Sequence, residues 1–144
     1  MSTPMDQDAV IKQLSAVPLF SGLNKKLLHT LAATATDRTY SPGEVIVRQD
    51  EKAVRFYLVT EGKVEVERGG KVVASLGPGQ YFGEMALLDE EPRTASVKAA
   101  SKARCVVLYS WEFWSSVGKD PEAMRSLLRE TVRRLRSSTP APED

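Results

Sequence analysis

The sequence contains one cysteine, Cys105, and one histidine, His29, among its 144 residues. A single cysteine excludes an intramolecular disulfide and a cage of thiolate metal ligands. One imidazole is too few for a β-barrel metal enzyme of the cupin kind, which uses several. We therefore expect a protein of a reducing compartment, with Cys105 packed inside a strand and His29 at the surface.

Long apolar runs and a net charge of either sign are also missing. No stretch approaches the ~20 apolar residues of a membrane-spanning helix, and residues 1–17 lack the apolar segment of a signal peptide. Twenty Lys and Arg nearly balance nineteen Asp and Glu, which leaves a formal charge of +1. This balance provides no general attraction to nucleic acid or to anionic membranes. We expect a cytoplasmic protein with no membrane span and no direct contact with nucleic acid.

The composition that remains is that of a folded domain. Hydrophobic residues make up 42% and charged residues 27% of a chain whose length suits one compact core. Helical spacing of apolar residues predicts one helix over residues 6–15 and a second over residues 24–35. Between residues 36 and 109, β-branched and aromatic residues form short runs separated by glycine turns, which indicates an antiparallel barrel or sandwich. The predicted strands are 36–40, 45–48, 56–60, 63–68, 72–76, 94–99 and 104–109.

Two more helices are predicted after the strands. Ser110 can cap the first and Gly118 can end it, and the second begins beside Pro121 with an apolar stripe opposite a set of arginines. The predicted organisation is an N-terminal helix over residues 1–17, a mainly β domain over residues 18–136, and a polar tail over residues 137–144.

The segment from Gly79 to Val97, GQYFGEMALLDEEPRTASV, has the features of an anion-binding site. Gly83 allows close approach of the backbone, and we expect the N–H groups from Glu84 to Leu87 to point outward from a short helix. The Arg93 guanidinium suits paired phosphate oxygens, whereas the Glu84 carboxylate accepts a hydrogen bond from a hydroxyl. Together they fit a ligand whose hydroxyl lies close to a phosphate, such as a cyclic nucleotide.

Two short motifs, FGEMALL at residues 82–88 and PRTA at residues 92–95, resemble the phosphate-binding cassette of cyclic nucleotide-binding domains. The resemblance covers about residues 18–136 and implies an antiparallel β-roll, or jelly-roll, with N-terminal helices and C-terminal lid helices. It implies that Glu84 binds the ribose 2′-hydroxyl and that Arg93, with amides near Gly83, Ala86 and Ala95, binds the cyclic phosphate. The site residues expected on this basis are Phe82, Gly83, Glu84, Met85, Ala86, Arg93, Thr94 and Ala95, with Val73 and Val97 in the apolar wall.

The resemblance also sets the expected ligand and output. Threonine at position 94 can favour guanine in this family without settling the base, and we expect cAMP, with cGMP as the second choice. The last helix is expected either to fold over the base as a lid or to pair with its counterpart in a homodimer. Arg129, Arg133, Ser138 and Thr139 are the candidates to reach the base from that helix.

Other interpretations of the same residues stay open or are set aside. Glu84 and Arg93 could form a purely structural pair, although such pairs contribute little stability. Glycines at 77, 79 and 83 have the spacing GxGxxxG, interrupted by Pro78 and followed by no strand-to-helix crossover, so a dinucleotide loop is dismissed. The arginines of the last helix are interpreted as a solvated face, because nucleic-acid recognition of the helix-turn-helix type needs a further helical unit.

We therefore expect a receptor and not an enzyme, since the cassette offers no nucleophile with its base and no metal. We hypothesise a stand-alone sensor in which cyclic nucleotide moves the C-terminal helix and so signals to an unidentified effector protein. The alternatives are a regulatory fragment separated from an effector such as a DNA-binding domain, and a scaffold whose pocket binds nothing.

Overall fold

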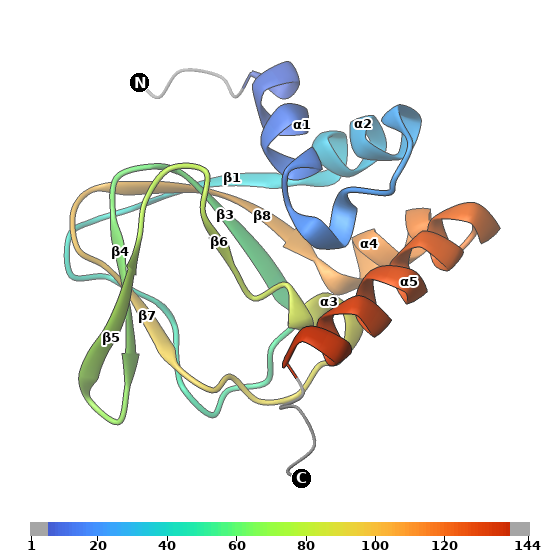
Figure 1. Cartoon of the computed structure of the whole chain (residues 1–144). Coiled ribbons are helices and arrows are strands. Elements are labelled where there is room, and N and C mark those ends of the chain that lie inside the picture. The colour runs from blue at the N-terminus through green and yellow to red at the C-terminus, as the bar shows by residue number, and fades with distance from the viewer. Residues whose placement is uncertain (1–5, 139–144) are drawn as a thin grey trace, which may run out of the picture.

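Figure 1 shows a computed structural model of the chain, which describes residues 6–138, with the helices gathered on one side and most of the strands on the other. The helical elements are α1 (Gln7–Ser15), the 3-10 turn η1 (Pro18–Phe20), α2 (Lys25–Thr34), α3 (Met85–Leu88), α4 (Ser110–Val117) and α5 (Pro121–Ser138). The strands are β1 (Thr36–Tyr40), β2 (Val45–Val47), β3 (Arg55–Glu61), β4 (Val64–Arg68), β5 (Lys71–Leu76), β6 (Tyr81–Phe82), β7 (Ser96–Ala99) and β8 (Ala103–Tyr109).

The strands form two antiparallel sheets with the orders β1-β8-β3-β6 and β2-β7-β4-β5. This arrangement is the β-roll with helices at both ends that the sequence predicts, and all seven predicted strands are present within one or two residues of their expected ends. The eighth strand, β6, is only two residues long and was not predicted. It pairs with β3 through Tyr57↔Phe82 and Leu58↔Tyr81, which holds the start of the cassette against the central strand of its sheet.

Strand β3 is buried on both of its faces, and so is β8. Because successive side chains of a strand point to opposite faces, Phe56 and Leu58 pack against the helices, whereas Tyr57 and Val59 pack between the two sheets. The apolar runs FYLV and CVVL are continuous in the sequence for this reason. The apolar core under the helices and the apolar core between the sheets therefore share β3 and β8, and the cassette lies beside these two strands.

The helices attach to the roll through caps and specific contacts. The side chains of Asp6 and Asn24 cap α1 and α2 by accepting hydrogen bonds from backbone N–H groups. In α4 the indole Nε1 of Trp114 donates to the carbonyl of Leu87 at 2.6 Å, which ties α4 to the cassette helix α3. No helix within residues 6–138 combines the length and apolarity needed to cross a bilayer.

The end of α5 differs from the prediction. The helix continues through Ser138, so residues 137 and 138, assigned to a polar tail, belong to it. The polar, arginine-rich sequence near residue 137 carries no stop signal such as a glycine, and the tail was assigned on composition alone. The rest of the predicted tail, residues 139–144, and residues 1–5 lie outside the described residues.

Cys105 lies in β8 inside the core between the sheets, and His29 is exposed on α2, as the sequence predicts. Burial, together with a smaller effect from Asp37, raises the pKa of the Cys105 thiol to about 12. The thiol is therefore protonated at neutral pH and has no thiolate to act as a nucleophile or metal ligand.

Candidate functional site

A cavity of about 400 Å³ lies between the segment 82–97 and the sheet that contains β2, β4 and β7. Its walls come from the predicted cassette and from β2, β4 and β7. The lining residues are Val47, Ala53, Val66, Arg68, Phe82, Gly83, Glu84, Met85, Ala86, Asp89, Glu91, Pro92, Arg93, Thr94, Ala95 and Val97. Nine of the ten predicted site residues are among them, so segments on both sides of the turn at 89–92 meet at one cavity. The size is within the usual range for small-ligand sites, ~300–1,000 Å³.

The position of Arg93 in this cavity depends on Gly83. Gly83 has a φ of +79°, and a Cβ built on it would lie 2.5 Å from Arg93 Nη1 and 2.6 Å from the Arg55 carbonyl oxygen. The absence of a side chain lets the guanidinium approach the backbone, where Arg93 Nη2 donates to the Arg55 carbonyl at 2.8 Å. The same guanidinium lies 5.7 Å from the centre of the Tyr57 ring. The arginine is thus fixed over the central strand.

No carboxylate of the described residues forms an ion pair with Arg93. Burial is the largest influence on this group and lowers the pKa of the guanidinium, and the positive charge of Arg55 also lowers it, whereas Tyr57 and Glu51 act in the opposite direction without cancelling the burial. Arg93 nevertheless stays protonated at neutral pH, because guanidinium is a very strong base. The cavity therefore presents a half-buried cation with no carboxylate of the described residues at ion-pair distance, although Glu84, Asp89 and Glu91 line the same cavity.

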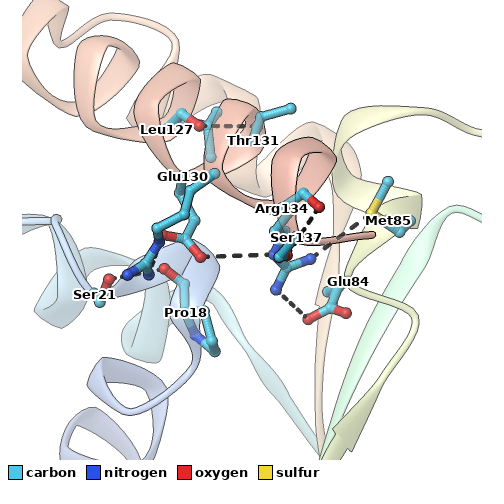
Figure 2. Close-up of polar contacts among 10 residues, drawn as sticks. Pro18, Ser21, Glu84, Met85, Leu127, Glu130, Thr131, Arg134 and Ser137 are labelled. Atoms are coloured by element: carbon cyan, nitrogen blue, oxygen red, sulfur yellow. Dashed lines mark hydrogen bonds and ion pairs between the residues drawn. The ribbon is translucent and has the colours of Figure 1, made fainter. Parts of the chain in front are cut away.

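Glu84 lines the same cavity, but its carboxylate also contacts the last helix. Figure 2 shows Arg134 reaching from α5 to the cassette, where its Nη2 donates to Glu84 Oε2 at 3.0 Å and its Nη1 contacts Met85 Sδ at 3.8 Å. Partial burial opposes the charge on Arg134, but the hydrogen bond and charge of Glu84 outweigh it and raise the pKa of Arg134. A second ion pair, 3.7 Å from Arg134 Nε to Glu130 Oε1, steadies the arginine on its own helix.

Tyr81 lies at the same junction, where burial and then the neighbouring Glu84 carboxylate raise the pKa of its phenol. The phenol is therefore neutral at physiological pH. It adds a polar group to the contact between cassette and α5 without adding charge.

The backbone donors of α3 differ from the expectation. The N–H of Ala86 donates to the Gly83 carbonyl at 3.1 Å, and the N–H of Leu87 donates to the Glu84 carbonyl at 3.1 Å. The tight turn that follows Gly83 bonds these amides within the first turn of the helix. They are consequently not the outward-pointing donors that we predicted from the sequence, although Ala86 itself lines the cavity.

The structure also corrects the position of Val73. This residue is 53% exposed on β5 and does not line the cavity. Strand β5 is at the edge of its sheet, and a register shift in its pairing with β4 falls between Val66 and Glu67. The apolar lining of the cavity comes instead from Val66 of β4, together with Val47 and Val97.

Two arginines at the site were missed by the sequence analysis. Arg68 ends β4 at the cavity, and its Nε donates to the Thr94 carbonyl at 3.3 Å. Arg134 reaches the cassette, whereas the candidates Arg129 and Arg133 line a hollow on the other side of α5. The helical period contains this information, because Arg134 is seven residues beyond the buried Leu127 and so shares its face. The other candidates, the side chain of Ser138 and Thr139, lie outside the described residues.

Comparisons with known proteins agree with this geometry. Residues 37–117 match the family model of the cyclic nucleotide-binding domain. The chain is 37% identical over 125 residues to a cyclic nucleotide-gated potassium channel of Mesorhizobium japonicum, covering 87% of this chain and 34% of the channel. It is 33% identical over 114 residues to the cAMP-dependent protein kinase regulatory subunit of Schizosaccharomyces pombe, covering 78% of this chain and 28% of that subunit.

Among solved structures, the N-terminal domain of a transcriptional regulator from Streptomyces coelicolor superimposes with a TM-score of 0.81 at 31% identity. The match covers 92% of this chain and 98% of that domain. The chain thus corresponds to a whole domain in that structure, while it spans about a third of the channel and of the kinase subunit.

Proposed function

Since the chain belongs to the cyclic nucleotide-binding domain family, we propose that its cavity binds cAMP and that the ligand acts through α5 on an effector protein. The chain is a cyclic nucleotide-binding regulatory domain. The choice of cAMP draws on the relative from Schizosaccharomyces pombe, whose name states that ligand. We place the protein in the cytoplasm as a receptor without catalytic activity, in keeping with relatives that are a channel and a kinase regulatory subunit.

The observation that carries the proposal is the state of Arg93 in the cavity. A half-buried guanidinium for which the described residues provide no ion pair has lost part of its hydration, and an anion that enters the cavity restores part of the missing electrostatic stabilisation. A cyclic phosphate carries one negative charge and two exocyclic oxygens, which suit the paired donors of guanidinium.

Glu84 gives the cavity its selectivity for a sugar beside the phosphate. Both side chains line the same 400 Å³ space, and a carboxylate accepts hydrogen bonds that a ribose hydroxyl donates. The valines at 47, 66 and 97 form an apolar wall suited to the flat face of a purine. The site thus offers one partner for each of the three parts of the nucleotide.

Titration calorimetry with cAMP and with cGMP tests the proposed function. We expect both nucleotides to release heat and to raise the melting temperature of the chain, with cAMP binding more tightly. Tighter binding of cGMP would overturn the choice of base. Absence of heat and of any melting shift with both ligands would overturn the receptor proposal in favour of a scaffold with an unused pocket.

The contact between Arg134 and Glu84 supplies the proposed coupling. The ribose and Arg134 share one carboxylate, so a ligand that binds Glu84 weakens the attachment of α5 to the cassette. The ligand then favours the arrangement of α5 to which it binds more tightly, by as much as the two affinities differ.

Replacing Arg134 with alanine is expected to raise the affinity for cAMP. The ion pair is partly exposed and so contributes about 1 kcal/mol, which corresponds to about a fivefold change in affinity. The matched control is Arg133→Ala, which removes the neighbouring arginine and its ion pair to Glu130 but leaves the cassette intact. Calorimetry compares the two variants. Weaker binding by the Arg134 variant would mean that Arg134 contacts the ligand and does not compete with it.

A further inference from the structure

The outer face of α5 carries an apolar stripe that the described part of the domain leaves uncovered. Leu128 is 62% exposed and Val132 is 46% exposed, and they lie four residues apart on one side of the helix. Half-buried Met124 borders this stripe. The described residues that line the hollow at this face all belong to α5: Pro121, Met124, Arg125, Leu128, Arg129, Val132, Arg133 and Arg136. The opposite side of the helix, with Ala123 and Leu127, is buried in the domain.

The arginines of this face follow one flank of the stripe. Positions 125, 129, 133 and 136 are spaced by three or four residues, which places them along adjoining turns of the helix. Arg133 pairs with Glu130 at 2.6 Å, whereas the described residues provide no ion pair for Arg125, Arg129 or Arg136. Within residues 6–138, no acidic residue lines the hollow. This face therefore combines exposed apolar side chains with an uncompensated positive edge.

We infer that the outer face of α5 docks an acidic amphipathic helix of a partner protein. The partner's apolar side chains would cover Leu128 and Val132, and its carboxylates would lie against the flank formed by Arg125, Arg129 and Arg136. An 18-residue helix is about 27 Å long, enough for four or five turns of a second helix to pack beside it. This partner would be the effector of the proposed function. The docking itself does not depend on that proposal; only its control by cyclic nucleotide does.

The charge pattern disfavours a second copy of this chain as the occupant. In an antiparallel two-fold pair of α5 helices the two arginine flanks lie on the same side of the seam and repel each other. A single helix of this length also makes a weak zipper without favourable charges beside the seam.

An anionic membrane fits the face less well than a helix does. Helices that lie in a membrane interface combine a Lys- and Arg-rich polar face, which α5 shares, with an apolar face that carries Trp and Phe as well as Leu. The uncovered stripe of α5 is narrow and aliphatic, and it has no aromatic residue. A narrow seam with charges on its flank is the pattern of helix-to-helix pairing.

The test uses the full chain and a labelled designed peptide, an amphipathic helix with leucines on one face and glutamates along the adjoining flank. Fluorescence anisotropy measures its binding to the unchanged protein and to the double variant Arg125→Glu/Arg129→Glu. The control variant is Lys25→Glu/Lys26→Glu, which makes the same change in net charge on exposed positions of α2. Thermal unfolding confirms that each variant folds.

We expect the Arg125/Arg129 variant to bind the acidic peptide at least about tenfold more weakly, and the Lys25/Lys26 variant to bind it unchanged. A peptide with lysine in place of each glutamate should bind the Arg125/Arg129 variant better than it binds the unchanged protein. Equal binding of a glutamine-substituted peptide, or an equal loss in both variants, would overturn the inference.

Two further measurements separate the other occupants. A dimer in sedimentation equilibrium that the Arg125/Arg129 substitutions dissociate would overturn the inference in favour of a second copy. Binding to vesicles containing phosphatidylserine, without binding of the acidic peptide, would overturn it in favour of a membrane. Peptide binding is measured with and without cAMP. Peptide binding in a chain that takes up no cAMP would support the docking surface and count against the proposed function alone.

Discussion

Replacing Arg93 with alanine is expected to weaken cAMP binding at least about a hundredfold. The substitution removes the cation that faces the cavity and leaves a bound phosphate partly desolvated without its partner. Loss of one member of a buried charge pair costs ~3–5 kcal/mol, and each ~1.4 kcal/mol is a tenfold change in affinity. Titration calorimetry measures the loss. Near-unchanged affinity in a folded variant would show that Arg93 is not the phosphate ligand.

Two conservative variants define what the arginine contributes. Arg93→Lys keeps the charge but loses the paired donors, so we expect an affinity between those of the alanine variant and the unchanged chain. Glu84→Gln should cost less than Arg93→Ala, because the amide oxygen still accepts a hydrogen bond from the ribose hydroxyl. A larger loss of cAMP affinity for Glu84→Gln than for Arg93→Ala would mean that Glu84 contributes more to binding than Arg93 does. Thermal unfolding of each variant shows whether the roll is intact.

Replacing Gly83 with alanine is expected to damage both the fold and the site. The new Cβ would lie 2.6 Å from the Arg55 carbonyl oxygen and 2.5 Å from Arg93 Nη1, closer than such atoms approach each other, at a φ of +79° that suits glycine. Arg93 must then leave its contact with the backbone. We expect the affinity for cAMP to fall at least about tenfold, together with the melting temperature, because the variant loses binding geometry as well as stability.

Gly79→Ala is the matched control for this substitution. Gly79 has a φ of +87°, but a Cβ built there meets no atom within 4 Å. Gly79→Ala therefore introduces only the strain of a positive φ, which costs about 1–3 kcal/mol of folding free energy. Each kcal/mol lowers the melting temperature by about 2–4 °C. Calorimetry and thermal unfolding compare the pair. If Gly79→Ala reduces cAMP affinity as much as Gly83→Ala, the contact with Arg93 is not the reason for the loss.

The strands and the cassette could be predicted because their signals are local. Short apolar runs, continuous or alternating, together with glycines at the turns mark each of the seven predicted strands, whereas β6 has only two residues and too little pattern to recognise. The cassette residues are neighbours in the sequence, so their shared cavity follows from one turn and one short helix. Nine of the ten named residues line one cavity, and their binding roles, including those of Glu84 and Arg93, stay predictions.

The parts that could not be predicted depend on how distant segments meet. Val73 lies in a strand that the sequence predicts, but β5 forms the edge of its sheet and is exposed along nearly its whole length, which no local pattern shows. Arg68 and Arg134 reach the site from β4 and α5, and no local pattern states where those elements lie. The sequence predicts that the N–H of Ala86 binds a ligand. In the structure this N–H donates to the Gly83 carbonyl, because the turn after Gly83 is tight, and the tightness of a turn cannot be derived from residue types alone.

The two opposite faces of α5 have a thermodynamic consequence. Arg134 joins one face to the cassette, while Leu128 and Arg125 present the other face to the outside. If bound nucleotide changes the affinity for a helix docked there by some factor, the docked helix must change the affinity for the nucleotide by the same factor. An effector would therefore set the concentration of nucleotide to which this domain responds, and the same chain could report different second-messenger levels in complexes with different effectors.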